Sequence, residues 1–315
     1  MMKLQRGAAL LTAMLIVTLV ASLASAMVWR QYRAVQIETA DRARAQSAWI
    51  LQGALDWARL ILREDMRANP NEAIDHLGEI WAVPLAEARL STFLAADKDN
   101  TADGPEAFLS GSIQDAQAQY NLRNLLSGPE VPELELRTLA RLCESAGVPA
   151  DTASRLAGQL RAAFAKTPEL ATAPLPPRNI DQLLWLGLSP EVVERLRPLV
   201  TLLPQPTPVN LNTAPREVIA ALFDGMDLAS AQRLVAQRQS APLHNLAELK
   251  PLLPSSVSVS AERAAFSSSF FIVDGRLRLE ERVLEERSLV QRVRNEVLVI
   301  SRQRINLLQP AARSP

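Results

Sequence analysis

The first long apolar run of the chain, from Ala8 to Trp29, contains no charged residue. Its length suits a helix that crosses the hydrocarbon core of a bilayer, which needs about 20 apolar residues. Lys3 and Arg6 precede the run, and basic residues mark the cytoplasmic side of a membrane helix. The pattern therefore predicts one membrane-spanning helix, with the rest of the chain on the outer face, which is the periplasm in a Gram-negative cell.

A helical pattern continues beyond the apolar run without a break. Leu51, Leu55, Ala58 and Leu62 recur at helical spacing, and no Gly or Pro occurs between Ala8 and Gln52. The sequence thus predicts one helix of roughly fifty residues, half in the membrane and half amphipathic.

The carboxyl-terminal part of the chain changes to the period of two that is typical of strands. Phe270 to Leu279 alternates between polar and apolar residues, and Ser288 to Val293 and Glu296 to Ile300 are rich in β-branched residues. We expect two or three antiparallel strands that pack on the exposed half of the long helix. Asp274-Gly275 also fits a hairpin turn, which would divide the first of these segments.

Between these parts, residues 130–255 have an almost wholly helical pattern. Asp151 is a predicted N-cap, and Ser189 is another, followed by proline at the first helical position. Thr213 is predicted to cap a third helix, and Asp227 stands at the start of a fourth.

Composition narrows the function classes. A chain of 315 residues exceeds the usual size of one domain, so we expect two folded units. Basic and acidic residues are equal in number (34 each), so no net charge attracts nucleic acid or anionic membranes. The lone Cys143 excludes an internal disulfide, and His76 and His244 are the only histidines. No nucleotide-binding glycine loop, metallopeptidase helix or nucleophile elbow is present. We therefore predict no catalytic residue and a protein that is not an enzyme.

The amino terminus admits three interpretations: a secretory signal cleaved after Ala24-Ser25-Ala26, a plain signal anchor, or a prepilin leader. Arg6-Gly7-Ala8-Ala9-Leu10-Leu11 resembles the cleavage junction of type IV pilins and type II secretion pseudopilins. The resemblance implies that a prepilin peptidase cleaves between Gly7 and Ala8 and methylates the new amino terminus at Ala8. Most family members have Glu at the fifth mature position, where this chain has Thr12.

The absence of that glutamate has a physical meaning. A charged amine among packed membrane helices is costly unless it is paired, and the Glu of an incoming subunit would neutralise the amine of the subunit ahead. A subunit with Thr12 has no such carboxylate, so it fits best at the filament tip. Loss of this Glu is a trait of the minor pseudopilin K family; alternatively, Thr12 is one tolerated residue in an apolar helix.

A second segment supports the same family. Residues 113–126 resemble the stretch of K pseudopilins in which a strand leads into the next domain, although Arg123 replaces the usual second Asn and Asn124 follows it. The implied fold class is α+β: a type IV pilin-like fold, in which a long amino-terminal helix packs on a small antiparallel sheet, with a large inserted all-α domain. In this family a glycine equivalent to Gly275 lies within a strand.

The resemblance also implies a domain plan. Residues 1–7 form the cleaved leader, 8–29 the transmembrane helix, 30–126 with 256–315 the periplasmic α/β head, and 127–255 the inserted helical domain. The expected partners are minor pseudopilins I and J, the major pseudopilin G and the prepilin peptidase, at the bacterial inner membrane.

Residues 209–249 also resemble the tandem helix-hairpin-helix of DNA-uptake proteins, so a membrane-anchored DNA-binding protein is the alternative. Such modules hold a phosphate on the backbone amides of a Gly-x-Gly hairpin. Here the hairpin Phe223 to Asp227 has a single Gly between two carboxylates. Nucleic acid is therefore an unlikely partner, because the basic side chains Arg233 and Arg238 are opposed by Glu217, Asp224, Asp227 and Glu248.

One acidic cluster suggests a metal. Asp97, Asp99 and Asp103 surround a turn and offer the hard oxygen ligands that Ca²⁺ prefers. The EF-hand pattern is not met, and a solvated acidic loop is the alternative. Members of the family can bind calcium in the periplasmic head, so calcium is the one cofactor that we expect, and none is required.

Overall fold

The structure is a computed structural model that describes residues 6–68, 74–90, 107–165, 173–254, 257, 260, 262–279 and 282–305, with side chains from residue 9 onward. The chain divides into two compact units, Met1–Gly53 and Ala54–Pro315.

Helix α1 runs from Arg6 to Ala68 without interruption. The prediction of one continuous helix is confirmed, and the helix is longer than expected at 63 residues. It ends just before Asn69-Pro70, where proline disfavours helical backbone in the residue before it. Within it, an 18-residue window has a mean hydropathy of 2.2, so the helix is long and apolar enough to cross a membrane.

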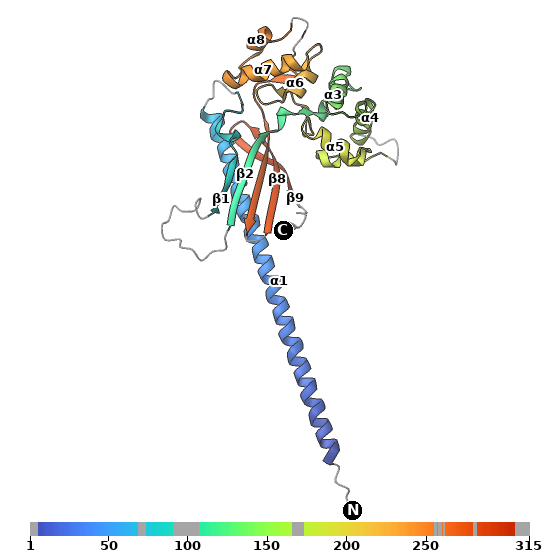
Figure 1. Cartoon of the computed structure of the whole chain (residues 1–315), viewed down its shortest axis with the longest axis vertical. Coiled ribbons are helices and arrows are strands. Elements are labelled where there is room, and N and C mark those ends of the chain that lie inside the picture. The colour runs from blue at the N-terminus through green and yellow to red at the C-terminus, as the bar shows by residue number, and fades with distance from the viewer. Residues whose placement is uncertain are drawn as a thin grey trace, which may run out of the picture. The chain divides into compact units, whose positions relative to one another are not determined.

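The second unit contains a five-stranded antiparallel sheet with the order β1-β2-β7-β8-β9 (Figure 1). Its strands are β1 Leu85–Arg89, β2 Ala107–Asp115, β7 Phe270–Leu279, β8 Arg282–Val293 and β9 Glu296–Ile305. The three carboxyl-terminal strands confirm the sequence pattern. The two or three strands expected there are thus confirmed as three, and β1 and β2 extend the sheet beyond that prediction. These two strands carry few large apolar residues and lack a strong alternating signal.

Of the two interpretations of Asp274-Gly275, the hairpin turn was wrong, and the family expectation of a glycine within a strand is confirmed, since both residues lie inside β7. Gly275 pairs with Gly111 on one side and with Glu286 on the other. A Cβ on Gly111 would lie 2.6 Å from the backbone oxygen of Asp274, so this position requires glycine.

The apolar face of the sheet packs against the last turns of α1. Leu55, Ala58 and Leu62 are buried there, which confirms three positions of the predicted helical stripe. The rings of Trp81 and Phe271 meet edge to face at 5.3 Å between centroids. The remaining buried members of this core are Val273, Val290 and Val297.

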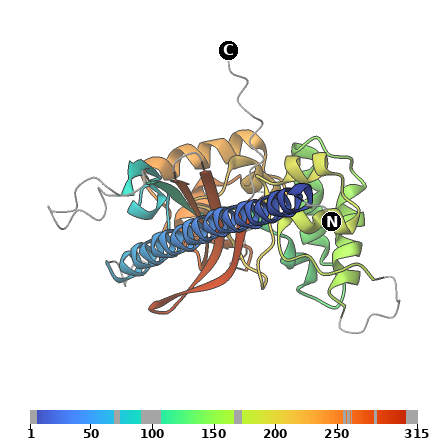
Figure 2. The same cartoon turned by 90° about the horizontal axis from the view of Figure 1, so that it is seen from below.

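Between β2 and β7 the chain forms a helical domain, and Figures 1 and 2 show α3, α4 and α5 on one side of α6 and α7. Its helices are α3 Glu133–Ser145, α4 Thr152–Ala163, α5 Pro190–Leu196, α6 Arg216–Leu222, α7 Leu228–Ser240 and α8 Leu246–Leu249. A 3₁₀ helix, η4 (Ile180–Leu186), precedes α5. Two short parallel pairs, β3 (Tyr120–Asn121) with β4 (Val200–Thr201) and β5 (Val209–Asn210) with β6 (Ala264–Ala265), connect its parts.

The same connection joins three pairs of helices in this domain. A glycine with positive φ lies in the connection of each pair, and the residue after it is apolar and buried. The glycines are Gly147 (φ 64°), Gly187 (φ 82°) and Gly225 (φ 82°), and the residues that follow are Val148, Leu188 and Met226. The helix-hairpin-helix resemblance thus reflects a repeated packing unit.

Of the three predicted caps, Ser189 is confirmed, since it accepts a hydrogen bond from Val192 N. Asp227, which was predicted only to stand at the start of a helix, also caps α7 by accepting a hydrogen bond from Ser230 N. The side chain of Asp151 precedes α4 as predicted but caps nothing. The prediction that Thr213 caps a helix was wrong, because Pro215 occupies the N-cap position of α6. The Thr213 hydroxyl is buried and donates a hydrogen bond to Asp115 instead.

Candidate functional site

The predicted processing junction lies in the first turns of α1, which begins at Arg6. The described side chains begin at residue 9, and cleavage between Gly7 and Ala8 and methylation of Ala8 stay predictions. The Thr12 hydroxyl donates to the backbone oxygen of Ala9 at 2.9 Å, within the helix. Thr12 therefore fits an apolar helix without adding a charge.

The predicted calcium ligands Asp97, Asp99 and Asp103 lie outside the described residues. The structure instead brings Asp65 and Asp75 together with Glu79, with ligand atoms within 4.8 Å of one another. Sequence reasoning missed this group, because its members come from α1 and from the loop before η1 (Ile80–Ala82) and share no motif.

A guanidinium, and not a metal, suits this acidic group. Arg292 of β8 donates to both carboxylate oxygens of Asp75, at 2.6 and 2.5 Å, and to Asp65 at 3.2 Å. Asp75 also accepts a hydrogen bond from Ser268 N at 2.6 Å. Burial, with a smaller contribution from Asp75, raises the pKa of Asp65, and burial raises the pKa of Glu79 to about 7. The Asp75 oxygens that would hold a cation are already committed to Arg292 and Ser268.

Next to Arg292 lies a buried polar joint between the sheet and the helical domain. Its centre is Asn210 of β5, which is fully buried. The Asn210 amide nitrogen donates to the Asp75 backbone oxygen (3.0 Å), Asp115 Oδ2 (2.9 Å) and Ser268 Oγ (3.0 Å). Its amide oxygen accepts from Asn212 N at 3.0 Å. One side chain of the helical domain thus binds three segments that flank the sheet.

Asp115 ends β2 and forms the other half of the polar joint. Besides Asn210, its carboxylate accepts hydrogen bonds from Thr213 Oγ1 and Ser268 Oγ, both at 2.6 Å, and from Gln117 N at 2.7 Å. Burial of the carboxylate raises its pKa to about 6. This network explains why Thr213 is unavailable as a helix cap.

Residues 113–126, whose motif suggested the family, form the amino-terminal side of this polar joint. Gln117 donates to Pro208 O at 3.1 Å and accepts from Ser269 N at 2.7 Å. Tyr120 donates to Glu135 Oε2 at 2.8 Å, and the Asn121 amide nitrogen donates to Gln205 O at 2.7 Å. Gln117, Tyr120 and Asn121 of the motif therefore fasten the start of the helical domain.

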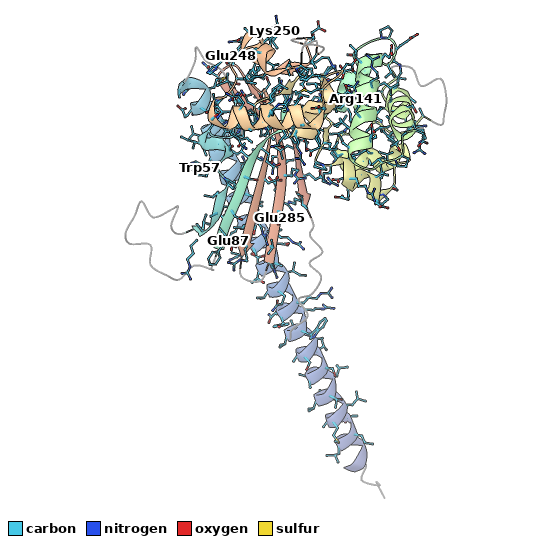
Figure 3. The ribbon with its side chains drawn as sticks, turned by 45° about the horizontal axis from the view of Figure 1, so that its top comes forward. Trp57, Glu87, Arg141, Glu248, Lys250 and Glu285 are labelled. Carbon is cyan, nitrogen blue, oxygen red and sulfur yellow. The ribbon has the colours of Figure 1, made fainter. Side chains whose placement is uncertain are left out.

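The hairpin between α6 and α7 is organised around its own carboxylate. Asp224 accepts a hydrogen bond from Arg137 at 2.8 Å and another from Arg141, both on α3, and the Arg141 bond is the main cause of its lowered pKa. Figure 3 shows Arg141 in the helical domain, whereas Glu87 and Glu285 lie on strands. Arg238 is buried and donates to Leu211 O. Arg137 and Arg141 thus hold a carboxylate of the hairpin, at the place where a DNA-binding hairpin would hold phosphate.

The helix, sheet and joint define the class of protein. A long apolar helix continues into a half that packs on an antiparallel sheet, and a helical domain is inserted between β2 and β7. This is an α+β, type IV pilin-like fold with a helical insert.

Comparison with known proteins gives the family. Two family profiles, both described as type II secretion system (T2SS), protein K, match residues 118–205 and 209–267. The first covers residues 118–126 of the motif and the first helices, and the second covers β5, the α6–α7 hairpin and β6. The chain belongs to the protein K family of type II secretion systems.

Individual relatives agree with this assignment. Type II secretion system protein K of Pseudomonas aeruginosa is 29% identical over 256 residues, which cover 74% of this chain and 72% of the relative. The protein K of Pectobacterium carotovorum is 25% identical over 95% of this chain and 96% of its own length. A chain in the crystal structure of the GspK-GspI-GspJ complex from enterotoxigenic Escherichia coli has the same fold, with a TM-score of 0.59 and 20% identity over 85% of this chain and 98% of that one.

Proposed function

We propose that the chain is a minor pseudopilin at the tip of the type II secretion pseudopilus, where it helps to initiate assembly and so supports export of folded proteins across the outer membrane. The role is structural, and no reaction is assigned to it. Family membership and the pilin-like fold support a filament subunit.

The buried polar joint is the observation that carries the tip position. It fastens the helical domain to the sheet through Asn210 and Asp115, beside Asp65 in the last turns of α1. A domain held in this way cannot swing aside easily, since moving it would expose buried polar groups without partners. Filament subunits stack their heads closely, so a fixed domain at this end of α1 would clash with a subunit added above it. At the tip there is no such subunit.

Thr12 supports the same position from the membrane side. A tip subunit has no predecessor whose amine needs a carboxylate, and Thr12 provides none. In this proposal the prepilin peptidase cleaves between Gly7 and Ala8 and methylates Ala8, and α1 anchors the protein in the inner membrane with its bulk in the periplasm. Its partners are minor pseudopilins I and J, with major pseudopilin G below them.

Co-purification tests the assembly role. The tagged full chain is co-expressed with I and J, with G alone, or with all three, and is extracted in mild detergent. We expect a complex with I and J that forms without G. Recovery of G alone, or of no partner, contradicts the proposal.

The mass of the mature protein tests the processing. We expect a chain that begins at N-methylated Ala8, and a Gly7→Val variant that keeps its leader. Gly53→Ala is the matched control, because a Cβ at Gly53 has nothing within 4 Å. A mature chain that begins after Ala26 would show a removed secretory signal and would refute the assignment.

A gel shift tests the DNA alternative. Because Arg137 and Arg141 are paired with Asp224, we expect no retention of duplex DNA by the full chain in detergent at 50 mM salt, which is about the lower end of the range where phosphate contacts are strong. Retention that falls steeply as salt rises would favour a DNA-binding protein instead.

We also propose that Asp97, Asp99 and Asp103 bind Ca²⁺ weakly. Isothermal calorimetry of the full chain with Ca²⁺ tests this, with Asp97→Ala as the variant and Asp151→Ala, an exposed carboxylate of the helical domain, as the control. Absence of heat above that of buffer contradicts calcium binding.

A further inference from the structure

Two arginines stand directly beyond the apolar run of α1. Arg30 and Arg33 are exposed, and neither forms an ion pair with a residue that the structure describes. The next two arginines along the same helix differ, because Arg42 pairs with Glu38 at 2.8 Å and Arg44 pairs with Asp41 at 3.4 Å. The cations nearest to the membrane are therefore the ones without a carboxylate partner.

Their position fits the polar boundary of a bilayer. At about 1.5 Å per residue, the run from Ala8 to Trp29 is about 33 Å long, and a hydrocarbon core is about 30 Å thick. Arg30 thus falls at the edge of the core, and Arg33 lies one turn farther on the same face of the helix. Trp29 and Tyr32 accompany them, and such aromatic residues prefer the interface between core and headgroups.

A shallow, open groove of about 650 Å³ lies on this face of the helix, and Ala34 and Ile37 line its far end beyond the arginines. On the apolar side it is lined by Ser25, Ala26 and Trp29, and the two arginines follow. The guanidinium of Arg33 lies 6.0 Å from the ring centroid of Trp29, which fixes one wall of the groove. Small side chains beside the core leave room for an acyl chain, and the cations lie where its phosphate would be.

Removal of the leader would leave Arg30 and Arg33 as the first charged side chains of the mature helix. Lys3 and Arg6 precede the apolar run but belong to the segment that cleavage after Gly7 would remove. The mature helix would then keep one amine at its inner end and no charged side chain before Arg30. Its depth in the membrane must be set largely from the outer end.

We propose that Arg30 and Arg33 bind the phosphate of an anionic phospholipid in the outer leaflet of the inner membrane, with the acyl chain in the groove beside Ser25 and Ala26, and so fix the depth of the mature helix. The proposal rests on the proposed processing and orientation. Charge complementarity selects the lipid, because an acidic headgroup supplies the counter-charge that the chain itself gives to Arg42 and Arg44.

Lipid selectivity tests this site. The full mature chain is reconstituted in phosphatidylcholine bilayers that contain spin-labelled phosphatidylglycerol or spin-labelled phosphatidylcholine, and electron paramagnetic resonance gives the relative association constant of the two lipids. One basic residue near an anionic surface contributes about fivefold, so we expect Arg30→Gln with Arg33→Gln to reduce the preference for phosphatidylglycerol by up to about 25-fold.

The matched control is Arg42→Gln with Arg44→Gln, which removes the same charge from the same helix but from paired positions. This control should keep at least half of the wild-type selectivity. Equal selectivity in the wild type and in the Arg30/Arg33 variant, or equal loss in both double variants, overturns the lipid site. Recovery of the complex with I and J is measured in parallel, so that failure of the lipid site and failure of the pseudopilin role give different results.

Discussion

Replacement of Asn210 by alanine is the most direct test of the polar joint. The change removes the amide NH₂, whose two protons are shared among three acceptors, and the amide oxygen that accepts from Asn212 N. Asp115 and Ser268 keep other partners, because they also bind each other at 2.6 Å. The Asp75 backbone oxygen and the Asn212 amide then lose a buried partner, and each such loss costs about 1–3 kcal/mol. We therefore expect Asn210→Ala to lower the free energy of unfolding by about 3–5 kcal/mol.

Thermal unfolding of the full chain in detergent, followed by circular dichroism, measures this loss. For a unit of this size about 1 kcal/mol corresponds to about 2–4 °C, so the midpoint should fall by about 10 °C. The matched control is Asn245→Ala, which removes an exposed cap that accepts from Ala247 N and Glu248 N and is worth about 1 kcal/mol. If both variants shift the midpoint equally, the buried joint does not hold the helical domain and the argument for its fixed position fails.

Three other predictions concern the same unit. Because burial raises the pKa of Asp115 to about 6 and of Glu79 to about 7, from 3.8 and 4.5, the native state holds protons that the unfolded chain releases. The stability that these protons contribute is full below about pH 4 and is lost as pH rises through 6 and 7. The unfolding temperature should therefore decrease as the pH is raised from 5 to 8. An unfolding temperature that increases over this range contradicts the burial of these carboxyls. Gly111→Ala should cost about 1–3 kcal/mol in a chemical denaturation series, because its Cβ would meet the backbone oxygen of Asp274 at 2.6 Å, and an unchanged midpoint would disprove that clash. The buried thiol of Cys143, whose pKa burial raises to about 11, should react with maleimide at pH 7 only after denaturant is added, and fast labelling of the folded chain would be the contrary result.

The regular periodic parts of the fold could be predicted from the sequence. The stripe of Leu55, Ala58 and Leu62 identified the packed face of α1, because one helix face needs only residues at a fixed spacing. The alternation in residues 270–279 identified β7 for the same reason. The alternating pattern of β2 is weak because Gly111 interrupts its apolar face, and only the family resemblance of residues 113–126 implied a strand that leads into the next domain. The reason for that glycine, the Asp274 backbone, is distant in sequence.

The polar joint could not be predicted, because it depends on pairs of residues that are far apart in the chain. Asn210 and Asp75 belong to separate segments, and neither has a local pattern that indicates the other. Thr213 illustrates the problem: its local sequence favours a cap, but the buried Asp115 carboxylate competes for the same hydroxyl. The repeated connections at Gly147, Gly187 and Gly225 did carry a local signal, a glycine followed by an apolar residue between two helices, which can be sought in other chains.

The two profile matches show how the joint and the family are connected. One match begins at residue 118, just after Asp115 and Gln117, and the other begins at residue 209, next to Asn210. Both sides of the polar joint therefore lie close to the start of a matched region. A buried carboxylate such as Asp115 destabilises a fold unless its partners are complete, and an apolar joint of the same size would be cheaper to maintain. The polar joint instead defines one orientation of the helical domain, since Asn210 and Asp115 are satisfied together only in that arrangement. In the tip subunit proposed above, a fixed orientation of the helical domain would matter more than maximal stability, because that domain would block a subunit added above it.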